Sequence, residues 1–531
     1  MSCWTLLHWM PSPPFFAIIL AYKVRRGDEL VSNEEVGLRL NKLRHLPIYQ
    51  GRQEALLTDL YQLTMMYGYY KSGHMDKEVV FDVFYRSNPC DNGYVIVAGL
   101  EQVVLYLTNL RFRDEELEYL KSTDLFDDGF LELLADFEFH GSLYAIPEGT
   151  VVFPNEPVMR IEGRLFELQL IESALLSFVN HQSLIATKAS RIVSATGGQV
   201  FDDTGSISEF GLRRAQNADA AMFGARSAFI AGCSSTSNVA AGFNFGIPVS
   251  GTQAHSWIQS FPTELEAFRT YADAYPNNVM LLVDTYDVLR SGIPNAIMVG
   301  REMRARGYDL QAVRIDSGDL AYLSKEARER LNQAGFTNTR IIVSDDLDED
   351  TIRDLLSQGA KIDGWGVGTA LITSKGCSSL GGVYKLAAEK TADGTFSPRI
   401  KISENPFKVT NPGRKKVVRF YVDELANADL IMLEDEPTPT GEPVLIFDPV
   451  HTYKQKTLTR YRVQELLAPI IDSGKLVYLL PTLKEIQQHA KNELRSISSE
   501  TRRAKNPHVY HVDLSRRLWE LKRDLVESLR V

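Results

Sequence analysis

The sequence predicts an α/β protein in which a parallel β/α barrel is joined to a second α/β domain. Three observations predict it. In the middle of the chain, short apolar runs alternate with helical patterns at a regular interval. Before that region, helical and strand-like segments are mixed without a regular interval. After residue 385 the regular alternation ends. Alternating strands and helices are typical of a parallel sheet, and mixed segments of an α+β domain.

The central rhythm is carried by apolar runs that end at Asp284, Asp316, Asp345 and Gly368, at intervals of 32, 29 and 23 residues. A helical pattern follows each of the first three runs. Units of this length imply parallel strands with right-handed crossovers. Two earlier segments, 208–211 and 247–252, fit the same scheme. Six or more such units favour a closed barrel over an open sheet.

The flanking segments predict the second domain. Helical spacing covers 54–72 and 165–194, strand-like alternation covers 79–85, and turn residues break 137–162 into short strands. The end of the chain, 479–529, has the pattern of amphipathic helices and is expected to return to the first domain. The chain is therefore divided into a poorly specified extension (1–50), an N-terminal α/β domain (51–190), the barrel (191–387) and a C-terminal part that completes the α/β domain (388–531).

Composition narrows the class of protein. The 531 residues are 44% hydrophobic and carry a formal net charge of −10, which excludes general disorder and argues against a nucleic-acid binder. We expect no membrane span, because no apolar stretch reaches 18 residues. We expect no signal peptide, because the basic residues follow the N-terminal apolar run 15–22. The cysteines, at positions 3, 90, 233 and 377, show no zinc or disulfide pattern, so we expect a cytoplasmic protein.

Polar side chains gather at the ends of the predicted strands, where a barrel brings them into one pocket. Arginines there suit phosphate or carboxylate groups, aspartates suit ribose hydroxyls or Mg²⁺, and glycine-rich turns suit phosphates. The residues are Arg213, Arg214, Arg314, Asp284, Asp316, Asp319, Asp345 and the stretches 366–369 and 379–382. Each taken alone is more simply a helix cap, a turn or a surface ion pair. Together they indicate an enzyme that acts on a ribose phosphate.

Longer motifs carry a family resemblance. The chain resembles nicotinate phosphoribosyltransferase over about residues 52–525, with the motifs in the same order: LTDLYQLTM (57–65), EFGLRRAQ (209–216), GTQAHSW (251–257), DTYD (284–287), RIDSGDL (314–320), GVGT (366–369) and SLGGVYKL (379–386). The resemblance implies a type II phosphoribosyltransferase fold. That fold is an irregular, funnel-like α/β barrel of the TIM-like kind, with an α/β domain built from both ends of the chain.

The resemblance also implies a reaction and its participants. Nicotinate, 5-phosphoribosyl-1-diphosphate and ATP would give nicotinate mononucleotide, diphosphate, ADP and phosphate in the salvage of NAD. Mg²⁺ is the implied cofactor, although its ligands cannot be assigned. The implied assembly is a homodimer whose active sites are shared between subunits.

The matched positions imply individual roles. His255 corresponds to the histidine that ATP phosphorylates, and Asp284 is the partner expected to orient it, with Asp287 the weaker candidate. The remaining matches surround the substrates. Around nicotinate they are Phe210, Thr252, Ser237, Arg314 and, from the neighbouring subunit, Tyr61. Around the ribose and its phosphates they are Arg213, Asp316, Asp345, Gly368 and Thr369. Asp316 is also expected to be catalytic.

Other enzymes of the same class, and other classes of protein, fit these residues less well. Nicotinamide phosphoribosyltransferase places an aspartate near the position of Ser237, where it would repel a carboxylate, so its absence favours nicotinate. Quinolinate phosphoribosyltransferase is much shorter and does not use ATP. A non-catalytic ribose-phosphate sensor would not need a phosphorylatable His255. A barrel aldolase or isomerase would need a Lys or Glu at a strand end, and Lys325 and Lys375 lie beyond those ends.

Overall fold

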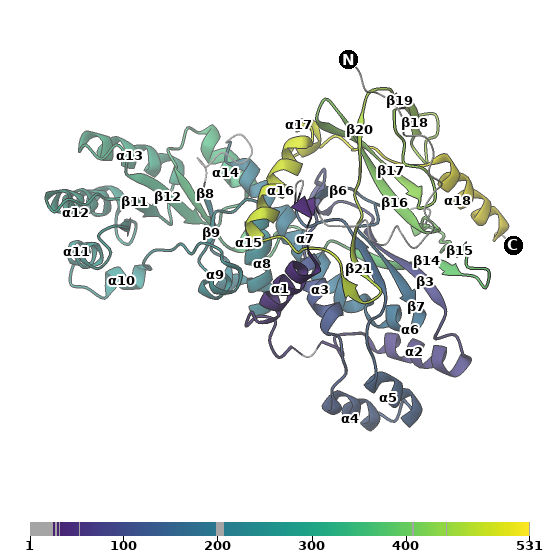
Figure 1. Cartoon of the computed structure of the whole chain (residues 1–531). Coiled ribbons are helices and arrows are strands. Elements are labelled where there is room, and N and C mark those ends of the chain that lie inside the picture. Colours follow the sequence, from purple (N-terminus) through teal and green to yellow (C-terminus); the bar gives the residue numbers. More distant parts are fainter. Residues whose placement is uncertain are drawn as a thin grey trace, which may run out of the picture.

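The computed structural model describes residues 25–26, 29–30, 32–52, 54–197, 206–405, 408–441 and 443–529. A lobe with a parallel sheet projects from a larger body that holds the antiparallel sheets (Figure 1). Within these residues, no helix has the length and apolar character that crossing a membrane requires. The N-terminal apolar run 15–22 lies outside them.

The lobe is built on six parallel strands. Their spatial order is β10 (Met280–Leu282), β11 (Ala312–Ile315), β12 (Arg340–Asp345), β13 (Gly364–Val367), β8 (Ser206–Glu209) and β9 (Ser235–Thr236). This confirms the strands expected near 278–284, 311–316, 340–345 and 362–368, and the earlier one near 208–211. Because every pair is parallel, all the carboxyl ends meet at one edge.

Helices connect these strands and cover the sheet. They are α8 (Ala218–Ile230), α9 (Val239–Phe245), α10 (His255–Gln259), α11 (Glu264–Ala274), the π-helical turn η4 (Val288–Gly292), α12 (Ile293–Ala305), α13 (Leu320–Gln333), α14 (Glu349–Ser357) and α15 (Thr369–Ile372). Several begin at a side chain that accepts from a free backbone N–H, as Thr263, Asp319 and Asp348 do for α11, α13 and α14.

Two details of the predicted barrel differ in the structure. Segment 247–252 is not a strand and makes one bridge, between Val249 and Thr236, because Pro248 lacks the N–H that a ladder needs. The short strand β9 takes its place in the sheet. In the described residues no ladder joins β9 to β10, so the sheet is open rather than closed.

The body contains two larger antiparallel or mixed sheets. One has the order β15 (Phe396–Pro398), β14 (Gly382–Lys390), β3 (Glu78–Tyr85), β7 (Met159–Arg164), β5 (Ser142–Ala145), β21 (Ala468–Asp472), β22 (Lys475–Leu476). The other has the order β20 (Arg462–Glu465), β16 (Lys415–Val422), β17 (Leu425–Leu433), β23 (Val512–Leu514). Because β14 and β21 pair with β3 and β5, both parts of the chain that flank the lobe build one sheet.

Three two-stranded pairs complete the strands: β1 (Arg25–Arg26) with β2 (Glu29–Leu30), β4 (Val95–Ile96) with β6 (Val151–Val152), and β18 (Val444–Phe447) with β19 (Gln455–Leu458). The body helices are α1 (Asn33–Arg44), α2 (Leu60–Ser72), α3 (Leu100–Asn109), α4 (Asp114–Ser122), α5 (Asp128–Ala135), α6 (Leu165–Leu170), α7 (Glu172–Ala195), α16 (Leu483–Ser496), α17 (Ser499–Arg502) and α18 (Arg516–Ser528). Short 3₁₀ turns are η2 (Pro89–Asp91), in the body, and η3 (Leu212–Arg214), in the lobe.

The long helix α7 joins the body to the lobe. It packs against α8 and α14 of the lobe and against β4 and β14 of the body. Small and aliphatic residues such as Ala186, Ala189 and Ile192 are fully buried along it, which lets neighbouring elements approach closely. The helix expected over 165–194 is therefore α6 followed by α7, and the helix expected over 54–72 begins later, at Leu60.

Helix α1 shows that part of the N-terminal extension is folded onto the body. Ser32 and Glu35 form a reciprocal capping box at its start. Val36 and Leu43 are buried, and Arg39 donates to the carbonyl oxygens of Leu480 and Pro481 at 3.2 and 3.1 Å.

The cysteine expectation needs correction. Cys90 and Cys377 form a disulfide, 287 residues apart in sequence, and Cys233 is free and buried. The spacing of the cysteines in the sequence does not predict this disulfide, because only the fold brings η2 next to the segment after α15. The cytoplasmic location inferred from the cysteine pattern stays a prediction.

Candidate active site at the strand ends

Arg314 on β11 is the centre of a polar cluster at the carboxyl edge of the parallel sheet. Its guanidinium donates to Thr252 Oγ1 at 3.0 Å, to Ser344 Oγ at 2.7 Å and to Asp316 Oδ1 at 2.7 Å. The same group lies 5.8 Å from the centre of the Phe210 ring. Segments that are distant in the sequence therefore meet around one arginine, as the strand-end argument predicts.

Asp316 is held as a carboxylate. Burial by itself would raise the pKa of Asp316, but the Arg314 guanidinium and the hydroxyl of Ser344 hold that pKa below its usual range. Ser344 also donates to Asp316. We conclude that Asp316 is ionised throughout the neutral pH range.

Asp284, at the end of β10, is anchored on one side and free on the other. Its Oδ2 accepts from the backbone N–H of Asp316 at 3.0 Å and from Ser317 Oγ at 2.7 Å. Its Oδ1 is buried and has no hydrogen-bond partner among the described residues. That oxygen is directed toward His255, 3.9 Å from Nε2.

His255 is the first residue of α10 and faces both carboxylates. Its Nε2 lies 3.7 Å from Asp316 Oδ2 as well as 3.9 Å from Asp284. Its Nδ1 lies 3.2 Å from Thr285 Oγ1. The side chain is 39% exposed, so an external phosphoryl donor can reach the ring.

Phe210 and Ser237 are fixed at the neighbouring ends of β8 and β9. Beneath them the buried Glu209 accepts from Thr236 Oγ1 at 2.6 Å, and the Ser237 backbone N–H donates to the Glu209 carbonyl at 2.9 Å. Burial raises the pKa of Glu209. A Cβ on Gly366 would stand 2.5 Å from the Phe210 ring, so only glycine at this position lets the ring lie flat over β13.

The residues matched to the ribose phosphates surround the same edge. Gly368 and Thr369 follow β13 at the start of α15, which packs against η3 and so lies beside Arg213. Asp345 ends β12 and is exposed, with a φ of 144°. A positive φ at a non-glycine residue is costly and is concentrated at functional sites.

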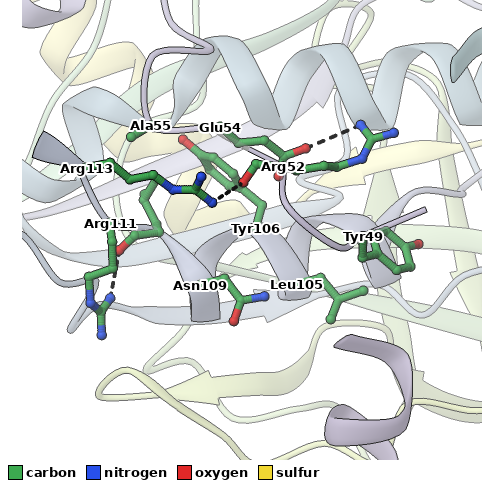
Figure 2. Close-up of a pocket in the computed structure, with 10 residues that line it drawn as sticks. Tyr49, Arg52, Glu54, Ala55, Leu105, Tyr106, Asn109, Arg111 and Arg113 are labelled. Atoms are coloured by element: carbon green, nitrogen blue, oxygen red, sulfur yellow. Dashed lines mark hydrogen bonds and ion pairs between the residues drawn. The ribbon is translucent and has the colours of Figure 1, made fainter. Parts of the chain in front are cut away.

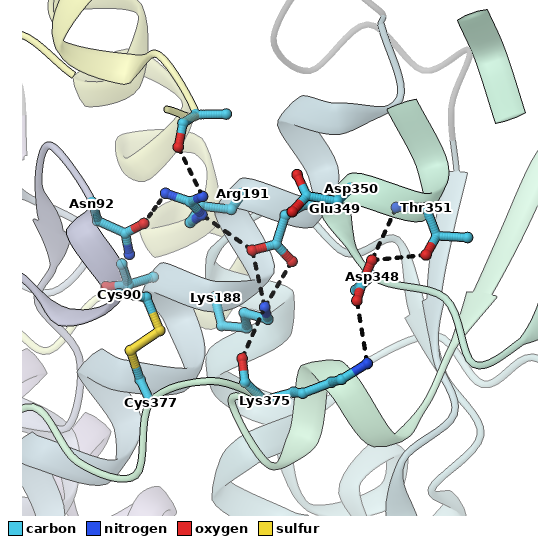
Figure 3. A network of polar contacts seen from close by, with 12 residues as sticks. Cys90, Asn92, Lys188, Arg191, Asp348, Glu349, Asp350, Thr351, Lys375 and Cys377 are labelled. Carbon is cyan, nitrogen blue, oxygen red and sulfur yellow. Dashed lines mark hydrogen bonds and ion pairs between the residues drawn. A yellow bond between two sulfur atoms is a disulfide. The ribbon is translucent and has the colours of Figure 1, made fainter. Parts of the chain in front are cut away.

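A buried ion-pair network links α7, the start of α14 and the segment after α15 (Figure 3). Lys188 on α7 pairs with Glu349 at 2.7 Å and donates to the Lys375 carbonyl at 3.2 Å. Arg191, also on α7, approaches Glu349 at 3.3 Å. Gly368 and Thr369 open α15, and Lys375 follows it, so Lys188 ties the segment after α15 to α7, and the disulfide ties Cys377 of the same segment to η2.

Some of the expected site residues lie elsewhere or do other work. Tyr61 is 50% exposed on α2, in the body and away from the lobe (Figure 1). Asp287 caps η4 by accepting from Leu289 and Arg290. Asp319 caps α13. Within a single chain these three residues do not join the His255 cluster.

Sequence reasoning missed the hydroxyl groups that hold the cluster together. Thr285, Ser317 and Ser344 bond to His255, Asp284 and Arg314. Each one adjoins a strand-end acid in the sequence, so the signal was present, but short polar side chains are too common in loops to be selected individually.

In the described residues no group of three His, Cys, Asp or Glu side chains could hold a metal ion by itself. A histidine near two carboxylates, next to a fixed arginine and a flat aromatic ring, is instead suited to a phosphorylated co-substrate and a small aromatic anion. Fold and site thus define an α/β enzyme of the phosphoribosyl-transferring class. The chain belongs to the nicotinate phosphoribosyltransferase family, because models of that family match three consecutive regions that together cover most of the chain.

Sequence matches cover nearly all of the described chain. Residues 56–180, 206–413 and 414–522 match the N-terminal domain, the central family region and the C-terminal domain of nicotinate phosphoribosyltransferase. The chain is 46% identical to nicotinate phosphoribosyltransferase of Bacillus subtilis, covering 90% of this chain and 96% of that one. It is 36% identical to the Caenorhabditis elegans protein of the same name, covering 88% and 92%.

Solved structures agree. The crystal structure of human nicotinic acid phosphoribosyltransferase aligns with a TM-score of 0.78 and 30% identity, covering 88% of this chain and all of that one. The superposition therefore extends over the body and the lobe together.

Proposed function

We propose that this protein transfers a phosphoribosyl group from 5-phosphoribosyl-1-diphosphate to nicotinate, with ATP hydrolysis coupled through phosphorylation of His255. The product, nicotinate mononucleotide, would enter NAD salvage. The observation that carries the proposal is the cluster in which Arg314 joins Thr252, Ser344 and Asp316 beside Phe210 and His255.

Nicotinate fits between an aromatic ring and a fixed cation. Its ring would stack on Phe210, and its carboxylate would take the place of Thr252 Oγ1 on the Arg314 guanidinium. Ser237 next to this ring carries no charge, so no carboxylate of the protein opposes that of the substrate there. This supports nicotinate over nicotinamide.

The transfer step needs little proton movement. The bond from the anomeric carbon to the diphosphate oxygen breaks, and the lone pair of the pyridine nitrogen forms the new C–N bond. Positive charge develops on the ribose ring as diphosphate leaves, and the ionised Asp316 is placed to stabilise it. Arg213, Gly368, Thr369 and Asp345 are proposed to hold the ribose and its phosphates.

In the coupling step the two nitrogens of the His255 imidazole have different roles. Asp284 and Asp316 face Nε2 and would keep the proton there, which leaves the lone pair on Nδ1, beside Thr285. Nδ1 attacks the γ-phosphorus of ATP, the bond to the bridging oxygen breaks, and ADP leaves. Water later hydrolyses the phosphohistidine.

Mg²⁺ is proposed as a cofactor that arrives with the substrates. Mg²⁺ is commonly bound through one or two carboxylates together with substrate phosphates, and the unpartnered Oδ1 of Asp284 is a suitable ligand. When bound, the ion would neutralise charge on the departing diphosphate.

The assembly is proposed to be a homodimer with shared active sites. Exposed apolar side chains gather in two places: on and before α2 (Leu57, Leu60, Tyr61, Met65), and near the strand ends (Leu212, Val239, Phe243, Val249). A two-fold axis would pair the first patch of one subunit with the second patch of its partner. Tyr61 would then reach the partner's nicotinate.

We propose the same division of the chain, with the open sheet in the place that the barrel has in the family fold. The open six-stranded sheet resembles a barrel in one respect: the carboxyl ends of its parallel strands lie along one edge. Residues 51–190 and 388–531 are proposed to form the domain that presents Tyr61.

Initial rates with nicotinate, nicotinamide and quinolinate at equal concentration test the substrate. We expect a strong preference for nicotinate, with product formation that depends on 5-phosphoribosyl-1-diphosphate. Ser237→Asp should weaken nicotinate use selectively, and Ser234→Asp is a matched exposed control. Equal rates with nicotinate and nicotinamide would overturn the assignment.

A further inference from the structure

A polar cavity lies in the body, and none of its lining residues belongs to the strand-end cluster. It has a volume of about 230 Å³ and lies between the segment that links α1 to α2 and the end of α3 (Figure 2). The lining residues are Tyr49, Arg52, Glu54, Ala55, Leu105, Tyr106, Asn109, Leu110, Arg111 and Arg113. The family reaction gives this cavity no role.

The lining of the cavity carries more positive than negative charge. Arg52, Arg111 and Arg113 line it, against one carboxylate, Glu54. In the described part of the chain, the guanidinium of Arg113 forms no ion pair with a carboxylate and donates to the Arg52 carbonyl at 3.4 Å. The Glu116 carboxylate accepts only from the backbone N–H of Arg113, at 2.9 Å. Arg111 pairs with Glu138 at 2.7 Å, but both side chains are about half exposed, so this pair is weak and easily exchanged.

A further arginine beside the cavity increases the repulsion. Arg44 donates to the carbonyl of Thr108, next to the lining residue Asn109. Its Nε is buried without a partner among the described residues. Burial, and then the charge of Arg111, lower the pKa of Arg44. A bound anion would relieve this repulsion between like charges.

The cavity also contains a hydroxyl donor without a partner. Tyr106 is 2% exposed, and its hydroxyl has no hydrogen-bond partner in the described structure. Unpaired buried hydroxyls are costly and rare in folded proteins, and each one calls for an explanation such as a ligand. Burial raises the pKa of Tyr106, so the phenol stays protonated and able to donate.

We propose that this cavity binds a phosphate-bearing small molecule at a site separate from the substrates. Arg52 is held in place by two contacts to Asp219, at 2.7 and 3.0 Å, while Arg111 and Arg113 supply planar donors that fit phosphate oxygens. Tyr106 donates a further hydrogen bond. Glu54, the one carboxylate in the lining, accepts from a hydroxyl of the ligand, which favours a phosphate ester over inorganic phosphate.

The test counts binding sites on the full chain by titration calorimetry, with diphosphate, inorganic phosphate and ribose 5-phosphate as probes. The wild type is expected to bind the preferred probe at one more site per chain than the variant Arg111→Ala/Arg113→Ala. The matched control is Arg516→Ala/Arg517→Ala, which removes two neighbouring, ion-paired surface arginines of α18. It should retain every site.

Tyr106→Phe provides a second variant that removes only the unpartnered hydroxyl. We expect it to weaken binding at this site about tenfold, since a hydrogen bond to a charged group is lost, and to leave basal transferase activity unchanged. Ribose 5-phosphate binding more tightly than inorganic phosphate would support the role of Glu54. Site number and affinities equal to those of the wild type in both variants would overturn the proposal, whatever the outcome for nicotinate.

Discussion

The side chains of Arg314 and Asp316 are joined by a 2.7 Å hydrogen bond. They are two residues apart along β11 and its extension, and side chains two apart on an extended chain point to the same face. The pair thus places a fixed cation for a substrate carboxylate next to a fixed anion for a developing ribose cation.

Arg314→Ala is expected to lower kcat/KM for nicotinate by about 10- to 100-fold, because hydrogen bonds to a charged group contribute roughly 1.5–3 kcal/mol. It should also raise the pKa of Asp316, so the acidic limb of the pH–rate profile would move to higher pH. Steady-state kinetics across pH measure both effects. Arg269→Ala, at a surface pair with Glu302, is the control, and unchanged nicotinate kinetics in Arg314→Ala would contradict this role.

Incubation with γ-labelled ATP should place an acid-labile label on the wild type. His255→Ala is expected to lose that label, whereas His140→Ala, at an exposed histidine of the body, should keep it. Equal labelling of the His255→Ala chain would exclude His255 as the acceptor. The measurement is the label that remains on the protein after acid treatment and after alkaline treatment.

Sharing of sites between subunits can be tested by mixing two inactive variants. Tyr61→Ala and His255→Ala chains, dissociated and reassociated in equal amounts, should recover up to about a quarter of wild-type activity. This follows because half of the dimers are then mixed and each of those holds one intact site. Recovery should be absent when either variant is treated alone, and no recovery in the mixture would count against sharing.

Lys188→Met should loosen the turn that contains Gly368 and Thr369. Glu349 would keep Arg191 but lose its closer cation, and the Lys375 carbonyl would lose a donor. We expect KM for 5-phosphoribosyl-1-diphosphate to rise roughly 3- to 10-fold with a smaller change for nicotinate, in line with the loss of one hydrogen bond to a charged group. Lys325→Met, at an exposed lysine of α13, is the control.

Asp513 on β23 should make stability depend on pH. Burial, and then the nearby Asp448, raise the pKa of Asp513 to about 6. The folded state then binds more protons than the unfolded state between about pH 4 and 6, so the free energy of unfolding falls as pH rises through that window. Asp513→Asn should remove the fall and be more stable by about 1 kcal/mol or more at pH 8, because a neutral amide avoids the cost of the buried charge.

Urea denaturation at pH 4 and pH 8 measures this effect. The two proteins should be equally stable at pH 4, where the carboxyl is protonated in the folded state. Asp524→Asn, at an exposed residue of α18, is expected to show no such difference. A gain for Asp513→Asn that is the same at both pH values would point to packing rather than charge.

The strands of the parallel sheet could be predicted from the sequence because they are buried on both sides and appear as apolar runs, as 340–345 does. The same reasoning failed for 247–252, where the apolar signal was present but Pro248 removed a ladder donor, and it overlooked β9, which is too short to have a pattern. The convergence of Arg314 and Asp284 followed from the parallel pairing of their strands, whereas His255 reaches the same edge on α10, after a segment that is not a strand.

Local pattern, set by the periodicity of burial and by capping residues, thus determined the helices, the strands and the shared edge at which the polar residues collect. Tertiary structure alone decided the partners: which hydroxyl bonds to Arg314, that Asp287 caps a helix instead of facing His255, and that Cys90 meets Cys377. It also decided that three arginines and Tyr106 line one cavity. These outcomes depend on contacts between segments up to hundreds of residues apart, and short-range sequence patterns carry no information about which distant segments become neighbours in the fold.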